Sequence, residues 1–271
     1  MRRERIVVAL LLLPSFFWLV AMGGWLYNLV ITVILMMAAV EYGKLFQHAG
    51  YRPSLFLLGA GAALLSISRS FPGNACTMVL SSLILLVMVR HLVAYERGDE
   101  RSGTDFAITL SGIVYIGWIG SHLITLRALE GGLWWILVIL PVTWVADSAA
   151  YMVGSRWGRH RLAPRLSPNK TWEGYIAGVL IGTVVGAALG ALWQIGAGNE
   201  ALISIRSGGV VALAISILAT FGDLGVSMFK RQLHVKDTGK LLPGHGGALD
   251  RIDTWIWAAV LGETVVSLLS S

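Results

Sequence analysis

Charged residues are scarce in this 271-residue chain, which has 21 Lys and Arg and 15 Asp and Glu. They make up 13% of the sequence, whereas a typical soluble domain has about 25%. Hydrophobic residues make up 56%, and the mean hydropathy is +0.72. A charge deficit of this size excludes an ordinary soluble globule, so the composition predicts an all-α, polytopic integral membrane protein.

Cysteine is also nearly absent, since Cys76 is the only one. A single thiol excludes an internal disulfide and a CxxC metal site. The net charge of +6 is compatible with nucleic-acid binding or with cationic loops on a membrane protein. The positions of the basic residues along the chain decide between these two interpretations.

Apolar runs close to the roughly 20 residues that a spanning helix requires recur along the chain, and they predict nine spans. The first run follows an Arg-rich start and resembles a signal peptide, but its length and the spans after it favour an uncleaved helix. The third run is short and is either a span or a re-entrant segment. The predicted spans are Ile6–Met22, Gly24–Val40, Ser54–Ser68, Ala75–Tyr95, Asp105–Leu126, Leu133–Gly154, Gly174–Ile195, Gly208–Phe229 and Thr254–Ser270.

The basic residues predict the orientation of these spans. With the N-terminus in the cytosol and the C-terminus outside, 18 of the 21 Lys and Arg fall in cytosolic segments, and only Arg69, Arg127 and Arg206 fall outside. This bias follows the positive-inside rule. The positive charge therefore marks the cytosolic face of a multi-pass protein of the plasma (inner) membrane, and no nucleic-acid partner is expected.

We divide the chain into two regions on this basis. Residues 1–130 form an N-terminal transmembrane region of about five spans, and residues 131–271 form a C-terminal transmembrane region with cytosolic loops 155–173 and 230–253. The seventh span carries a glycine at every fourth position, from Gly174 to Gly190. Such a seam lets another helix approach closely, either inside the chain or at a subunit interface.

Acidic residues inside spans are costly and often functional. Asp147 and Asp223 each lie roughly 10 Å from the cytosolic end of their helix, by the rise of 1.5 Å per residue. Asp250 and Asp253 flank the start of the last span. These carboxylates predict a shallow pocket on the cytosolic side, although structural ion pairs, such as Asp223 with Lys230, remain an alternative.

The two cytosolic loops combine these carboxylates with many Lys and Arg side chains. That combination suits a polyanion held through Mg²⁺, which binds one or two carboxylates together with phosphate oxygens and waters. The N–H groups of Gly246 and Gly247 are able to approach a phosphate. In the run "SPNK", Ser167 and Lys170 offer phosphate donors, unless the loop serves only to orient the protein.

These loops resemble the phosphatidate cytidylyltransferase (CDP-diacylglycerol synthase) family. That family's signature runs S-x-x-K-R-x4-K-D and then H-G-G-x-x-D-R-x-D, and every fixed position is present. A second similar run extends from Asp147 to Gly174, with Asn169 where lysine is frequent. The motifs cover the C-terminal half, and the first half matches only as hydrophobic spans. The signature residues are Ser227, Lys230, Arg231, Lys236, Asp237, His245, Gly246, Gly247, Asp250, Arg251 and Asp253.

The resemblance implies transfer of CMP from CTP to phosphatidic acid in phospholipid biosynthesis, with release of pyrophosphate, by a Mg²⁺-dependent homodimer. The implied metal ligands are Asp223 and Asp250, with Asp147 and Asp253 as further candidates. The implied catalytic residues are Asp223, Asp250, Lys230, Arg231, Lys236, Asp237, His245 and Arg251. The implied substrate-binding residues are Ser167, Lys170, Ser227, Gly246 and Gly247.

Two other functions remain open at this point. One is a related CTP-dependent transferase or a kinase that acts on another lipid. The other is a transporter for phosphorylated anions, which Glu263 near the middle of the last span favours. Transporter sites usually lie near the membrane midplane, whereas most charges here collect on the cytosolic side, so an enzyme is the preferred interpretation.

Overall fold

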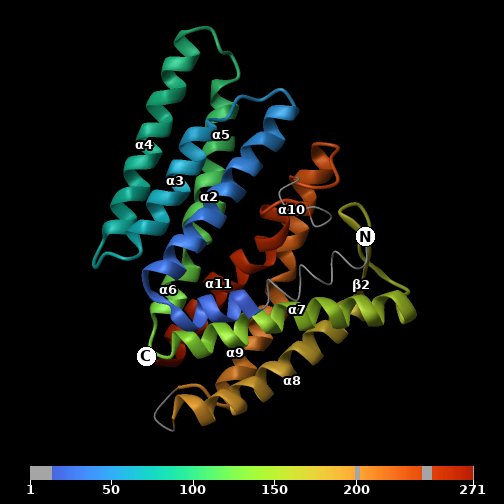
Figure 1. Ribbon diagram of the computed structural model, residues 1–271. Helices are drawn as coiled ribbons and strands as arrows, with labels where there is room; N and C mark the ends of the chain where they lie inside the picture. The colour runs from blue at the N-terminus through green and yellow to red at the C-terminus, as the bar shows by residue number, and fades with distance from the viewer. Residues whose placement is uncertain (1–13, 199–201, 240–245, 271) are drawn as a thin grey trace. The chain divides into compact units, whose positions relative to one another are not determined.

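The computed structural model describes residues 14–198, 202–239 and 246–270. The chain forms two compact units (Figure 1). The first comprises Met1–Thr125 and Gln232–Ile252, and the second comprises Leu126–Arg231 and Asp253–Ser271. The division into regions 1–130 and 131–271 stays a prediction, and the segment 232–252 belongs with the first unit.

The first unit is a bundle of antiparallel helices joined by short turns (Figure 1). The helix α3 begins after Ser54, whose side chain accepts a hydrogen bond from the N–H of Leu57 and so caps the helix. The helix α2 packs on α5, where Tyr42 donates or accepts a 2.7 Å hydrogen bond with Ser111. After helical residues 14–22, its elements are α2 (Gly24–His48), α3 (Leu55–Ser68), α4 (Ala75–Glu96), α5 (Ser102–Gly112), the π-helical segment η1 (Ile113–Ile119) and α6 (His122–Ala128).

The second unit has α7 packed on α8, and α8 packed on α9 (Figure 1). A small antiparallel β-hairpin joins α7 to α8, with Arg161 opposite Thr171 and Ala163 opposite Ser167. The prediction of an all-α chain missed this hairpin. The elements are α7 (Gly132–Trp157), β1 (Arg161–Ala163), β2 (Ser167–Thr171), α8 (Trp172–Ala197), α9 (Ile205–Leu218), α10 (Thr220–Gln232) and α11 (Leu249–Ser270).

Seven helical segments within the described residues are long and apolar enough to cross a membrane, which supports a polytopic membrane protein. The predicted third span is α3, a shorter apolar helix of 14 residues. The predicted first span lies partly outside the described residues. The seven segments are Gly24–His48, Ala75–Glu96, Ser102–Ala128, Gly132–Trp157, Trp172–Ala197, Ile205–Gln232 and Leu249–Ser270.

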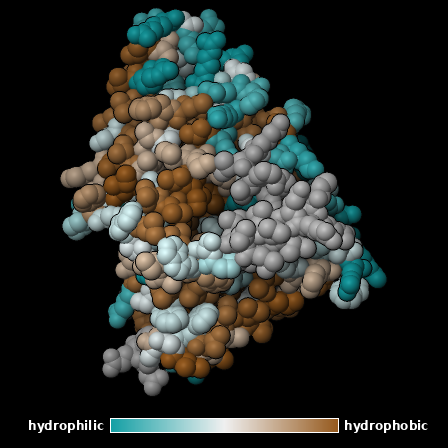
Figure 2. Space-filling model, viewed as in Figure 1, coloured by the Kyte–Doolittle hydropathy of each residue, from teal (hydrophilic) through white to brown (hydrophobic). Residues whose placement is uncertain are grey.

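Two of these segments expose most of their apolar side chains. On α4, Met78 and Leu85 are each 68% exposed, and on α8, Leu180 and Val184 are 62% and 68% exposed. Hydrophobic side chains accordingly cover much of the face shown in Figure 2. Contiguous apolar surface of this kind marks a membrane or partner interface, and on helices of spanning length it fits contact with lipid.

The glycine seam of α8 is used for packing inside the second unit. All five glycines of the seam are buried. A Cβ atom at Gly178 would meet the carbonyl oxygen of Ala146 on α7, and a Cβ at Gly186 would meet the Cβ of Ala212 on α9. Glycine is therefore required here so that three helices approach closely, and the seam is not a subunit interface.

Candidate functional site

The β-hairpin places Lys170 directly before the first turn of α8. Thr171 ends β2 and caps α8, because its Oγ1 accepts a 3.2 Å hydrogen bond from the N–H of Gly174. Thr171 is buried against Gly154 and Gly158 at the end of α7, where a Cβ on either glycine would meet its side chain. The rigid hairpin therefore fixes the backbone that carries Lys170.

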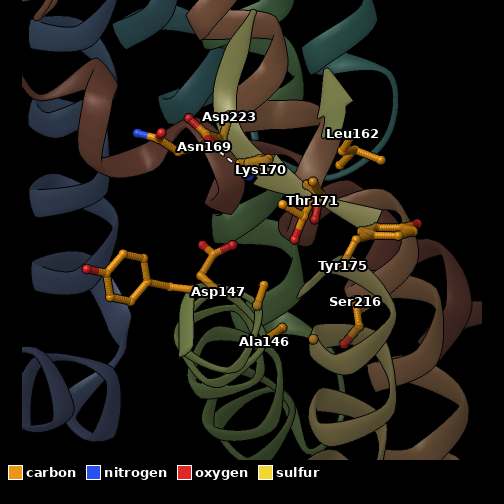
Figure 3. A pocket seen from close by; sticks show the side chains of 13 residues that line it. Ala146, Asp147, Leu162, Asn169, Lys170, Thr171, Tyr175, Ser216 and Asp223 are labelled. Atoms are coloured by element: carbon orange, nitrogen blue, oxygen red, sulfur yellow. Dashed lines mark ion pairs between the residues drawn. The ribbon is translucent and has the colours of Figure 1, made fainter. Parts of the chain in front are cut away.

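A pocket of about 250 Å³ opens between the hairpin, α7, α8, α9 and α10 of the second unit (Figure 3). Lys170 Nζ lies 2.9 Å from Asp223 Oδ2, and Asp147 points into the same space from α7 (Figure 3). The side chains of Lys170 and Asp223 are 24% and 31% exposed. A polyanion that enters this pocket thus meets a cation and two carboxylates together.

Asp223 is the centre of this group of charges. Its carboxylate is close enough to the carboxylate of Asp147 for the two to repel each other, and the ammonium group of Lys170 attracts both. Asp253 on α11, which is buried, lies within electrostatic reach of Asp223 and Lys230. Carboxylates that share a site repel each other unless cations offset their charge, so the arrangement favours positively charged groups between them.

The donor set in the pocket fits Mg²⁺. Throughout the described ranges, no three His, Cys, Asp or Glu side chains are placed to hold a metal by themselves. Mg²⁺ does not require such a cage, because it usually takes one or two carboxylates and completes its shell with phosphate oxygens and waters. Asp223 with Asp147 or Asp253 would supply those carboxylates.

The last turns of α10 bring further predicted residues to the pocket side of the second unit. Ser227 Oγ donates to Asp223 Oδ1 over 3.4 Å. Arg231 Nε donates to the carbonyl oxygen of Leu166 over 3.2 Å, which ties the end of α10 to the turn before Ser167. These contacts join the loop 155–173 to the helix that carries Asp223.

Asp250 lies in the first unit and organises the polar segment around it. Its Oδ2 accepts hydrogen bonds from Thr238 N at 2.8 Å, Thr238 Oγ1 at 2.9 Å and Gly247 N at 3.1 Å. Gly246 has a φ of +84°, a conformation that favours glycine. The N–H of Gly247, which we predicted to approach a phosphate, is thus engaged by Asp250.

The remaining predicted residues of this segment are on its surface or beyond the described ranges. Lys236, Asp237 and Arg251 are exposed, as expected for groups that meet a soluble substrate. His245 lies outside the described residues, so the role predicted for it stays a prediction.

The sequence reasoning did not single out three polar residues of the pocket wall. Ser216 and Thr220 line the pocket together with Asp223. The three residues occupy positions i, i+4 and i+7 of the sequence, a spacing that places side chains on one helix face. Polar residues at this spacing in an otherwise apolar segment were the signal that could have identified them. Tyr175 also lines the pocket, and its hydroxyl donates to the carbonyl oxygen of Ile217 over 2.8 Å.

Comparison with known proteins gives a consistent result. A family model described as the cytidylyltransferase family matches residues 3–269. A protein of Pseudomonas aeruginosa named phosphatidate cytidylyltransferase is 34% identical over 268 residues, which cover 94% of this chain and 93% of that protein. Proteins of the same name from Synechocystis sp. and Staphylococcus haemolyticus are each 29% identical, over 99% and 96% of this chain and 98% and 96% of theirs.

Proposed function

Because this chain belongs to the cytidylyltransferase family, we propose that it is a phosphatidate cytidylyltransferase. It transfers CMP from CTP to phosphatidate and releases CDP-diacylglycerol and pyrophosphate. The observation that carries this proposal is the pocket in which Lys170 pairs with Asp223 while Asp147 faces them. The pocket lies between helices of spanning length, and α8 among them has exposed apolar side chains, as access of a lipid phosphate from the bilayer would require.

The chemistry of the substrates sets what the protein must do. An oxygen of the lipid phosphate attacks the α-phosphorus of CTP, and the bond from that phosphorus to the pyrophosphate oxygen breaks. The second pKa of a phosphate monoester is about 6, so this nucleophile is already ionised at neutral pH. No general base is required, and catalysis rests on positioning and on offsetting negative charge.

The side chains of the pocket suit those two tasks. Lys170 and Lys230 neutralise phosphate oxygens, and Arg231 gives α10 a planar donor group beside the hairpin. Asp223, with Asp147 or Asp253, would hold Mg²⁺, and we also propose Asp250 as a metal ligand on the ground of the family signature. When bound, the ion offsets the charge of the triphosphate.

The test of this function uses purified full-length protein in lipid nanodiscs. With CTP, phosphatidate and Mg²⁺, it should form CDP-diacylglycerol and pyrophosphate in equal amounts, measured by mass spectrometry and a coupled assay. Product from a polyprenol or another lipid phosphate instead of phosphatidate would indicate a related transferase or kinase. Movement of a labelled phosphorylated anion across proteoliposomes without CTP turnover would indicate a transporter.

We further propose that the protein is a homodimer of the inner membrane with nine spans, a cytosolic N-terminus, an outer C-terminus and a cytosolic pocket. The bias of Lys and Arg among the loops supports this orientation. Size-exclusion chromatography with light scattering of the purified protein would test the dimer, and a monomer mass would refute it.

The orientation makes a direct prediction for single-cysteine variants in a Cys76→Ser background. A cysteine at Arg159, between α7 and β1, should react with a membrane-impermeant maleimide only in inverted vesicles. A cysteine at Ser270, at the end of α11, should react only in intact cells or right-side-out vesicles. Labelling of both positions from the same side would contradict the predicted orientation.

A further inference from the structure

Glu41 is a carboxylate in an apolar helix and makes contacts far away in the sequence. It lies near the end of α2, within a segment of spanning length. Its Oε2 accepts a 3.0 Å hydrogen bond from the N–H of Leu249 and lies 3.4 Å from Thr238 Oγ1. These partners flank the part of the polar segment that carries the glycines of the family signature.

The segment is shaped to receive this carboxylate. A Cβ at Gly239 would collide with Glu41 Oε1, and a Cβ at Gly247 would collide with Glu41 Oε2. Two glycines thus leave the space that the Glu41 side chain fills. Gly247, which we predicted to approach a phosphate, has this packing reason for lacking a side chain.

The contacts of Glu41 satisfy groups that the segment cannot satisfy alone. Leu249 is the first residue of α11, and the N–H groups of a first helical turn have no partner within the helix. A carboxylate at that position is also favoured by the helix dipole. Thr238 is buried, and its hydroxyl donates to Asp250 Oδ2 at 2.9 Å and lies 3.4 Å from Glu41 Oε2, so both carboxylates contact the same threonine.

The position of this contact in the signature indicates its purpose. Thr238 directly follows Lys236 and Asp237, and Leu249 directly precedes Asp250 and Arg251. We propose that Glu41 is a positioning residue for the cytidylyltransferase reaction, which clamps the two halves of the signature segment, Lys236–Asp237 and Asp250–Arg251, at a fixed spacing. This inference rests on the proposed function.

The test compares Glu41→Ala, Glu41→Gln and Glu41→Asp with Glu96→Gln, a matched control on the exposed end of α4. Glu41→Ala should lower kcat/KM for CTP by about 10-fold or more, since small displacements of catalytic groups cost up to about 100-fold. Glu41→Asp should retain more activity than Glu41→Ala, because it keeps the charge. Glu96→Gln should match the wild type.

A second measurement reports the clamp without using activity. Trypsin cleaves after Lys and Arg, and the segment contains Lys236 and Arg251. Release of the clamp should speed cleavage between these residues by about fivefold or more in Glu41→Ala, because proteolysis follows local opening. The melting temperature of the whole protein should stay within about 4 °C of the wild type, because the clamp is a local contact.

Gly239→Ala supplies an independent reciprocal test. The three nearest atoms that the added methyl group would meet all belong to the Glu41 side chain, and Gly239 is not among the glycines with positive φ, so its φ suits alanine. The variant should lose activity as Glu41→Ala does, and the double variant Glu41→Ala/Gly239→Ala should be no worse than Glu41→Ala alone.

The outcomes separate this inference from the proposed function. The clamp would be overturned if Glu41→Ala had the activity and the cleavage rate of the wild type. It would also be overturned if Glu41→Ala lost activity while its cleavage rate stayed unchanged, or if the effects of Glu41→Ala and Gly239→Ala were additive. An inactive wild type would refute the proposed function, while the cleavage rates of Glu41→Ala and Gly239→Ala would still decide whether the clamp exists.

Discussion

Asp223→Asn should lower kcat by about 100-fold or more, equivalent to about 2.7 kcal/mol of transition-state stabilisation. Asparagine keeps the shape of the side chain but removes the charge that pairs with Lys170 at 2.9 Å and that would bind Mg²⁺. Steady-state pyrophosphate release at saturating CTP and phosphatidate measures the effect. Asp99→Asn, the same change at a half-buried residue of the loop after α4 that does not line the pocket, should leave kcat within about twofold, because it touches none of the proposed catalytic groups.

The main competing explanation for such a loss is a purely structural ion pair. Removal of one partner of a pair leaves an uncompensated charge, whereas removal of both is often nearly neutral. Lys170→Met/Asp223→Asn should therefore recover activity if the pair is only structural. We expect the double variant to stay as inactive as Asp223→Asn, and recovery would show that Asp223 has no role beyond its pairing with Lys170.

Much of the pocket could be predicted from the sequence because charge in an apolar helix is conspicuous. Asp147 and Asp223 stood out as ionisable residues within spans, and their similar depth predicted that they face one pocket. The structure places both along that pocket. The prediction worked because it combined helix rise with the cost of burying charge, and neither depends on which helices are neighbours.

Two features could not be predicted from the sequence for physical reasons. The β-hairpin is too short for an alternating pattern, since β1 has three residues and β2 has five. The contact of Glu41 with Leu249 joins residues 208 positions apart, and local periodicity carries no information on such pairs. Glu41 near the end of an apolar run also looks like an ordinary boundary residue, and only its partners reveal its use.

Asp250→Asn should also lower kcat by about 100-fold or more, and its effect on metal binding should identify the cause. Asp250 Oδ2 already accepts three hydrogen bonds, two from Thr238 and one from Gly247. The carboxylate therefore holds the segment together through Oδ2, and we also propose Asp250 as a Mg²⁺ ligand, so its two roles have to be separated. Activity titrated against free Mg²⁺ should show a half-activating concentration raised by about 10-fold or more, as expected for the loss of 1.4 kcal/mol of binding.

Thr238→Val is the matched control that separates the two roles of Asp250, holding the segment and binding Mg²⁺. It removes the hydroxyl donor to Oδ2 but keeps the N–H donor and the carboxylate charge. If Asp250 binds the ion, Thr238→Val should leave the half-activating Mg²⁺ concentration unchanged and lower kcat by less than about 10-fold, as expected for one lost hydrogen bond of about 1 kcal/mol. Mn²⁺, which prefers the same oxygen ligands, should bind normally to Thr238→Val and weakly to Asp250→Asn by electron paramagnetic resonance. Equal losses of activity in the two variants, with Mn²⁺ binding intact in both, would show that Asp250 only holds the segment together.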